Sequence, residues 1–244
     1  PALYDLTTLQ RDANRLLGFT AQQTLDYLQN LYEKKLCTYP RTDSRYLTTD
    51  MAEGLPVLVN LVANAMPFRK GIAISCDAAA VINDKKVSDH HAVIPTRNIR
   101  DADLSALPVG ERAILELVAL RLLCAVAPSH TYAETAVTVE CADMEFTAKG
   151  RTVKQPGWRA LDAAYRASLK NAPEPDKEAE TKALPELTEG QILPVAGAAV
   201  KEGKTSPPKH FSEDTLLAAM ETAGAKDMPE DAERKGLGTP ATRA

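Results

Sequence analysis

The chain has 244 residues, which is enough for one or two domains with a sizeable core. Apolar residues make up 44% and charged residues 25% of the sequence, as in ordinary globular proteins, and no apolar run is long enough to span a membrane. The formal net charge of −4 counts weakly against a nucleic-acid-binding protein, although a local groove of Arg and Lys matters more than the total.

Four widely separated cysteines point to the redox environment: Cys37, Cys76, Cys124 and Cys141. None of them forms a CxxC pair, so a zinc site is not expected. We interpret them as small buried hydrophobic residues in a reducing compartment, which predicts a cytoplasmic location.

Two helices are predicted at the start of the chain. Asp5 can cap a helix over residues 6–17, which carries an apolar stripe. Thr20 begins a capping-box sequence for a second helix over about residues 20–35. The pair is either a helix-turn-helix-like unit or an ordinary helical hairpin, and in both cases the second helix leads directly to Tyr39.

Further helices are predicted before residue 130. A short one is expected after Thr48 or Thr49, and another over residues 56–65, with a proline in its first turn. Residues 71–108 are irregular in composition. Residues 111–127 are apolar on most sides, which predicts a buried helix.

The hydrophobic period changes after residue 130. Residues 131–140 alternate in the manner of a strand. Lys149-Gly150 is typical of a hairpin turn, which predicts short strands over 145–148 and 151–154.

The remaining elements are predicted from weaker patterns. Trp158 and Tyr165 are expected to anchor the β-rich part. Residues 167–189 are polar and contain several prolines, which indicates a loop or linker. Residues 191–201 are predicted to form another strand, and residues 212–222 a helix.

The stretch from Thr38 to Leu47 carries the clearest chemistry. Pro40 disfavours helical angles at Tyr39, so Tyr39 is expected to be extended and Arg41 to point to the same side. A guanidinium can hold a phosphate while a phenol oxygen attacks phosphorus. Only about one phenol in a thousand is ionised at neutral pH, and one cation at about 4 Å supplies at most roughly 4 kcal/mol. A second cation or a base is therefore expected, unless the stretch is only a polar turn with a half-buried tyrosine.

Three runs in this region closely resemble the type IA DNA topoisomerases: Leu9 to Thr20, Leu31 to Leu36 and Thr38 to Ser44. The nearest branch looks like topoisomerase III. In that family the tyrosine of this motif cuts one DNA strand and stays attached to its 5′ end. The resemblance therefore implies that Tyr39 is the catalytic nucleophile and that Arg41 assists it.

His90 and His91 form a second candidate site. Two adjacent histidines in a polar loop are consistent with solvated or locally hydrogen-bonded side chains, and their spacing makes metal binding the weakest option. The run from His90 to Thr96 matches the histidine motif of the topoisomerases, and alignment on Pro95-Thr96 makes His90 the functional histidine. An imidazolium near the scissile phosphate would supply the second cation.

The end of the chain holds a third candidate. Gly236-Leu237-Gly238 precedes Thr239, a good helix N-cap residue, and the spacing is not that of a P-loop. The stretch is either a simple helix-entry turn or a place where phosphate approaches the backbone. The resemblance implies that this stretch binds single-stranded DNA, with contacts from Thr239, Thr242 and Arg243.

Other polar residues near Tyr39 are candidates for DNA contact. Arg45 extends the basic character of the loop, and Asp43 is a candidate for orienting Arg41 or handling protons. Ser44, in the same motif, is also expected to contact DNA. Arg11 and Arg15 are further candidates for a DNA groove. For these charged residues a solvated or structurally paired role is the alternative.

The resemblance implies an α+β multidomain protein. It predicts a helical, winged-helix-like domain over 1–130 that bears Tyr39, and an antiparallel β arch segment over 131–204 with a linker at about 167–189. It also predicts the start of a helical DNA-binding domain over 205–244. Because the chain begins with Pro1 and stops soon after a fresh helix cap, we expect a segment of a longer protein.

The implied activity is that of an isomerase. The family opens one DNA strand through a 5′-phosphotyrosyl link, passes another strand through the gap and reseals it without ATP, which relaxes or decatenates DNA. Its Mg²⁺ is held by a Toprim domain that this chain lacks, so no metal site is expected here and the segment alone is expected to be inactive. The expected partners are single-stranded DNA and the remaining domains of the parent chain, with no membrane and no indication of oligomeric state.

Two other classes fit parts of the pattern. Tyrosine recombinases need several Arg and His residues before a tyrosine near the C-terminus, whereas Tyr39 comes early and His90 follows it. A non-catalytic winged-helix DNA-binding module would keep the helices and would tolerate the loss of the Tyr39 hydroxyl.

Overall fold

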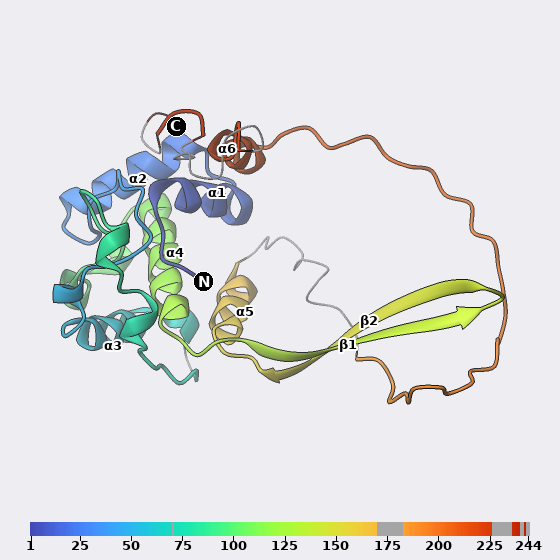
Figure 1. The fold of residues 1–244 in the computed structure, drawn as a ribbon. Helices are drawn as coiled ribbons and strands as arrows, with labels where there is room; N and C mark the ends of the chain where they lie inside the picture. The colour runs from blue at the N-terminus through green and yellow to red at the C-terminus, as the bar shows by residue number, and fades with distance from the viewer. Residues whose placement is uncertain (70, 170–182, 226–235, 240–241, 243–244) are drawn as a thin grey trace. The chain divides into compact units, whose positions relative to one another are not determined.

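A computed structural model describes residues 1–69, 71–169, 183–225, 236–239 and 242 (Figure 1). The chain forms two compact units, each described below by itself. The helical unit comprises Pro1–His130, Pro156–Glu174 and Phe211–Ala244, and the hairpin unit comprises Thr131–Gln155 and Pro175–His210.

The helical unit contains the helices seen in Figure 1, joined by loops and short 3-10 turns. Their bounds are α1 Leu6–Leu17, α2 Ala21–Glu33, α3 Leu55–Ala65, α4 Val109–Ala125, α5 Arg159–Ser168 and α6 Glu213–Glu221. The predicted helices over 6–17, 20–35, 56–65, 111–127 and 212–222 are confirmed to within a few residues.

The first two helices begin at the residues that the sequence predicts. The Asp5 carboxylate accepts a hydrogen bond from the Thr8 N–H at 2.7 Å, which caps α1. Thr20 and Gln23 form a reciprocal capping box at the start of α2. These bonds satisfy backbone donors that would otherwise lack partners at a helix N-terminus.

Both of these helices end in a left-handed residue. Gly18 has φ +73° after α1, and Lys35 has φ +59° after α2. At the end of α2 the Leu36 N–H donates to the Leu31 carbonyl at 2.8 Å and both side chains are buried, which defines a Schellman motif. This motif reverses the chain and sends it toward Tyr39.

Helix α4 lies at the centre of the helical unit and packs against α1, α2, α3 and α5. Its apolar residues are buried on nearly all sides, as the sequence predicts. Near its start Glu111 is also buried, and its carboxylate pairs with Lys34 and accepts a hydrogen bond from the Asn30 amide. A fully buried Leu or Ile side chain contributes about 2 kcal/mol to stability, so the buried apolar residues of α4 contribute strongly to the core's stability.

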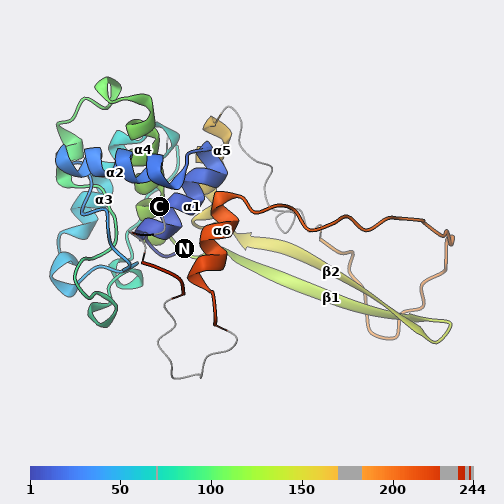
Figure 2. The same cartoon turned by 90° about the horizontal axis from the view of Figure 1, so that it is seen from above.

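Helices α5 and α6 also belong to the helical unit. Tyr165 of α5 is fully buried and packs edge-to-face on Phe68, with ring centroids 5.4 Å apart. The expectation that Tyr165 anchors the β-rich part is therefore wrong. Helix α6 packs beside α1 (Figure 2). The sequence analysis assigned α5 to an arch segment and α6 to a further domain; those functional domain boundaries stay a prediction.

The hairpin unit is built on a two-stranded antiparallel sheet of β1, Thr131–Cys141, and β2, Met144–Gln155. The predicted turn at Lys149-Gly150 is wrong, because Gly150 lies inside β2 opposite Thr135. The turn is made by Ala142 and Asp143, whose φ angles of +51° and +59° suit the right-handed twist of the strands.

One further expectation is wrong, and another is not confirmed. Residues 191–201 form no strand, and Ile192 and Val200 are almost fully exposed. The winged-helix description is not confirmed either, because the described part of the helical unit has isolated β-bridges but no wing-like sheet. The fold class that holds is a mixture of helices with a two-stranded antiparallel sheet. Most of the linker expected over 167–189 lies outside the described residues.

Candidate active site

Tyr39 lies in the extended segment that follows α2, and its side chain is half-buried. Its ring packs against the ring of His90, with centroids 4.2 Å apart and planes tilted by 37°. On another side it meets Tyr32 edge-to-face, with centroids 5.6 Å apart and planes at 85°. The structure therefore brings together the two side chains that the sequence analysis singled out as nucleophile and second cation.

The tyrosine and histidine loops meet because their backbones are hydrogen-bonded to each other. The Thr38 N–H donates to the Ile94 carbonyl at 3.0 Å, and the Thr38 hydroxyl accepts from the Ile94 N–H at the same distance. The Thr96 N–H donates to the Leu36 carbonyl at 2.9 Å. These bonds fix the register between two segments that are far apart in the sequence.

Thr42 ties the loops together beyond Tyr39. Its buried hydroxyl donates to the His90 carbonyl at 2.8 Å and accepts from the Ser44 N–H at 3.1 Å. The hydroxyl thus serves as donor and acceptor at once, and it sets the backbone position of His90.

The N-terminal segment forms the third side of this frame. The Leu6 N–H donates to the Thr42 carbonyl at 3.1 Å, and the Val93 N–H donates to the Tyr4 carbonyl at 2.8 Å. Residues 3–6 therefore contact the tyrosine loop and the histidine loop directly, and a shift of this segment would move both.

A polar cluster anchors that segment to the core. The buried Tyr4 hydroxyl donates to Asp12 at 2.7 Å, and Arg121 of α4 pairs with the same carboxylate and donates to the Tyr4 oxygen. Burial raises the pKa of Tyr4. Burial also acts to raise the pKa of Asp12, but Arg121, Tyr4 and Arg15 outweigh it and hold that pKa below its usual value. Asp12 is therefore ionised and paired at neutral pH.

Arg41 and Asp43 are exposed on the tyrosine loop, and neither forms a hydrogen bond or ion pair with the described residues. An exposed guanidinium without a carboxylate partner can bind a phosphate, as expected of Arg41. Its orientation toward Tyr39 stays a prediction.

Arg45 and Ser44 have intramolecular partners instead. Arg45 donates from Nε to the Leu3 carbonyl at 3.2 Å, so it braces the N-terminal segment. Ser44 is buried, and its hydroxyl donates to the Lys86 carbonyl at 2.8 Å. Their expected DNA contacts stay predictions, and the role supported by these hydrogen bonds is to hold the loop.

The C-terminal candidates form a small turn. The Thr239 N–H donates to the Thr242 hydroxyl at 2.8 Å, and both residues are exposed. The Leu237 N–H donates to the Met220 carbonyl at 2.8 Å, which places this turn at the end of α6. Arg243 lies outside the described residues.

The two arginines of α1 are structurally paired. Arg11 donates from Nε to Asp214 of α6 at 2.9 Å and lies 3.8 Å from Glu221. Arg15 pairs with Asp12 at 2.6 Å. The alternative given for them, a paired charge rather than a DNA groove, is the one that the geometry supports.

The described residues contain no cluster of three or more His, Cys, Asp or Glu side chains that could hold a metal ion. The Mg²⁺ implied by the resemblance belongs to a Toprim domain, and the described residues offer no ligand set that fits it. Cys37, two residues before Tyr39, is fully buried, and burial raises the pKa of its thiol. This thiol is consequently a poor nucleophile.

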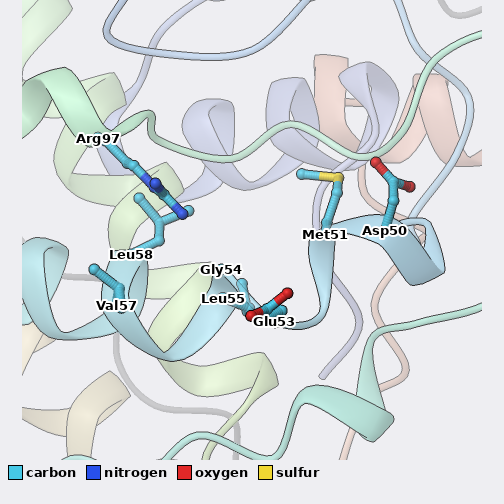
Figure 3. Close-up of a pocket in the computed structure, with 8 residues that line it drawn as sticks. All are labelled: Asp50, Met51, Glu53, Gly54, Leu55, Val57, Leu58 and Arg97. Carbon is cyan, nitrogen blue, oxygen red and sulfur yellow. The ribbon is translucent and has the colours of Figure 1, made fainter.

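A surface cavity of about 520 Å³ lies away from this site, at the start of α3. Figure 3 shows Arg97 pointing toward the start of that helix, with Glu53 beside Gly54 and Asp50 on the opposite side of the cavity. A Cβ at Gly54 would lie 2.5 Å from the Arg97 Nη2 atom, so the guanidinium uses the space that glycine leaves. Neither Tyr39 nor His90 lines this cavity.

Comparison with known proteins identifies the class. A family model described as DNA topoisomerase matches residues 1–244. The chain therefore belongs to the DNA topoisomerase family. It is 42% identical over its whole length to DNA topoisomerase 3 of Bacillus licheniformis and of Bacillus subtilis, and 40% identical to that of Shouchella clausii. These relatives place it in the topoisomerase III branch of the type IA group, as the sequence motifs predict.

The match covers only part of each relative. The chain spans 34% of the length of these curated relatives. The whole chain is also similar in fold to part of full-length topoisomerase I from Thermotoga maritima, with a TM-score of 0.63 and 20% sequence identity. The match covers 36% of the Thermotoga chain. Within the described ranges, every helix is too short or too polar to serve as a membrane span.

Two residues of the site were missed by the sequence analysis. Thr42 carried no signal, because a threonine in a polar loop is compatible with many roles. Tyr32 lies seven residues before Tyr39 and across a chain reversal, so only the left-handed conformation of Lys35 brings the rings together.

Proposed function

We propose that this chain carries the strand-cleaving tyrosine of a type IA DNA topoisomerase. The Tyr39 oxygen attacks a backbone phosphorus, the bond from phosphorus to the 3′ oxygen breaks, and a 5′-phosphotyrosyl link forms. The phenol loses its proton and the departing 3′ oxygen gains one. The observation that supports this role is the half-buried Tyr39 ring held against His90 at 4.2 Å.

His90 and Arg41 are proposed to assist the attack. An imidazolium beside the phenol would stabilise negative charge on the attacking oxygen and on the phosphate. The exposed Arg41 guanidinium would bind the phosphate oxygens in a fork. Thr42 contributes indirectly, because it holds the His90 backbone in place.

The phosphotyrosyl bond keeps the energy of the broken backbone bond, so resealing needs no ATP. In the whole protein the substrate would be single-stranded DNA, and passage of another strand through the gap would relax or decatenate DNA. A Toprim domain elsewhere in the parent protein would bind Mg²⁺. We further propose a cytoplasmic location, a winged-helix-like role for the α1–α2 region, and DNA contacts from Asp43, Ser44, Arg45, Thr239, Thr242 and Arg243.

A strand-cleavage assay on the complete natural protein tests the proposal. Single-stranded DNA labelled at its 3′ end should become covalently attached to the wild-type protein, while a 5′ label should be released. Tyr39→Phe removes only the attacking oxygen and should abolish the adduct. Tyr46→Phe is the matched control, since it removes a phenol from the same loop.

Each outcome separates the candidate functions. Adducts that persist in Tyr39→Phe would refute Tyr39 as the nucleophile. If the wild-type protein binds DNA but forms no adduct, a non-catalytic binding module is favoured instead. Retention of the 5′ label instead would indicate a 3′ link, as in tyrosine recombinases. The 244-residue chain alone should give no detectable adduct.

A further inference from the structure

Tyr32 carries the second ring that contacts Tyr39, and it has no role in the chemistry proposed above. It stands on the last turn of α2, and 40% of the residue is exposed. Its ring meets Tyr39 edge-to-face at 5.6 Å. In the described part of the chain, neither of these two phenol oxygens has a hydrogen-bond partner, so ring contacts are what orient the Tyr39 side chain.

The two rings that flank Tyr39 differ in how firmly they are held. His90 is exposed on a loop and is fixed through its carbonyl by Thr42, and the ring contact of its imidazole is the one with Tyr39 itself. Tyr32 belongs to a helix, and its carbonyl accepts a hydrogen bond from the Lys35 N–H at 2.8 Å within the Schellman motif. A group carried by a helix is positioned more accurately than one carried by a loop.

We infer that Tyr32 is a positioning residue for the Tyr39 nucleophile. The edge-to-face contact restricts the Tyr39 ring to the orientation that packs against His90, so that the phenol oxygen stays directed toward incoming phosphate. This inference rests on the proposed role of Tyr39. An edge-to-face aromatic pair should change the population of the favoured Tyr39 ring orientation by about two- to twelvefold.

A purely structural role for Tyr32 fits the geometry less well. A ring that is 40% exposed contributes little to the core, in contrast to Tyr165, which is fully buried. Tyr27 offers a comparison on the same helix, since its ring pairs edge-to-face with Phe19 at 5.3 Å and lies away from Tyr39. Loss of Tyr27 therefore removes an aromatic pair from α2 without touching the nucleophile.

The test measures cleavage and binding separately in the complete protein. Tyr32→Ala, Tyr32→Phe and Tyr27→Ala are each saturated with a single-stranded oligonucleotide. The rate of adduct formation is then followed in a single turnover, and the oligonucleotide Kd is measured on its own. Tyr32→Ala should slow adduct formation about fivefold with Kd unchanged. Tyr32→Phe should restore the wild-type rate, because the ring and not its hydroxyl makes the contact.

Four outcomes would overturn the inference. An Ala rate within a factor of about 1.5 of wild type shows that the contact does not matter. A matching loss in Tyr32→Phe assigns the effect to the hydroxyl, and a fivefold rise in Kd makes Tyr32 a DNA-binding residue instead. An equal loss in Tyr27→Ala assigns it to general weakening of α2. If Tyr39→Phe still forms adducts, it is the proposed function that fails, whatever Tyr32 does.

A second readout does not depend on activity. The Tyr39 ring lies close enough to His90 to displace the imidazole proton resonances by its ring current. Tyr32→Ala should move those resonances toward the values measured in Tyr39→Ala, whereas Tyr27→Ala should leave them in place. If the imidazole resonances do not shift in Tyr32→Ala, the positioning role is contradicted.

Discussion

The residue that redirects the chain from α2 to Tyr39 is a lysine in a conformation that glycine adopts most easily. Lys35 has φ +59° at the end of a Schellman motif, whereas the equivalent position after α1 is Gly18 at φ +73°. Lys35 is exposed, and its side chain has no partner among the described residues. We therefore predict that Lys35→Gly stabilises the protein.

The magnitude follows from two opposing effects. A residue with a Cβ in the left-handed region loses about 1–2 kcal/mol relative to right-handed angles. Glycine loses more backbone entropy on folding, which opposes the gain by about 0.5–1 kcal/mol. The net increase in the free energy of unfolding should be about 1 kcal/mol, and Lys35→Asn should give a smaller gain because Asn tolerates this region better than Lys.

Gly18→Ala is the control with the opposite change, because it adds a Cβ at a left-handed position. A Cβ at Gly18 would meet no atom within 4 Å, so the substitution adds backbone strain and no steric clash. It should lower the free energy of unfolding by about 1 kcal/mol. Both variants are measured by urea denaturation of the complete protein at equal m-values. A neutral or destabilising Lys35→Gly, beside a destabilising Gly18→Ala, would show that the lysine side chain contributes to the motif and would refute the strain argument.

Three further predictions concern hydrogen bonds and a turn of the helical unit. Asp12→Asn should lower the free energy of unfolding by about 2 kcal/mol at neutral pH, because Arg121 keeps no carboxylate partner. The Asp12 pKa is lowered on folding, so its contribution is present above pH 4 or so and is lost as the pH falls; the difference between wild type and variant should shrink in denaturation curves below about pH 4. Thr42→Val should slow adduct formation more than tenfold and destabilise by about 2 kcal/mol, since it leaves the His90 carbonyl and Ser44 N–H unpaired, whereas Thr42→Ser should retain most activity. Gly157→Ala should destabilise by about 3 kcal/mol in thermal unfolding, because φ is +54° and the new Cβ would lie 2.4 Å from the Ser129 carbonyl oxygen; a neutral result would show that this turn can rearrange.

Local signals in the sequence were sufficient for the helices. Asp5 and Thr20 carry their capping information within a few residues, and α4 is apolar on most sides, so its burial could be predicted without any knowledge of its neighbours. The hairpin turn could not be predicted in this way. Lys149-Gly150 matches a common turn sequence, but the turn uses Ala142 and Asp143, and the choice depends on pairing along the whole length of both strands.

Residues 191–201 show why an apolar run alone does not define a strand. Their apolar residues are compatible with a strand, yet a strand exists only when another backbone satisfies its hydrogen bonds. In the structure they form no ladder, and Ile192 and Val200 are exposed. A short apolar run is thus compatible with a strand but does not establish one.

The candidate site divides in the same way. Tyr39, Arg41 and His90 could be named from motif residues, because chemistry restricts which side chains can attack and stabilise phosphate. The contacts that bring Tyr39 and His90 together could not be named, since they join backbone groups more than fifty positions apart, such as Thr38 and Ile94. Thr42 acts through one hydroxyl and leaves no pattern in the sequence.

Substitutions around the site should act in two different ways, depending on whether they loosen the N-terminal anchor or the contacts between the two loops. The tyrosine loop and the histidine loop are both hydrogen-bonded to residues 3–6, which Tyr4 anchors to Asp12 and Arg121. Any change that loosens this anchor moves both loops together and can preserve their mutual contacts. A change at Thr42 or Tyr32 instead acts between the loops and disturbs the Tyr39 ring relative to His90. Damage to the anchor should therefore lower stability with little effect on the chemistry, whereas damage between the loops should slow the chemistry whether or not stability is also lost.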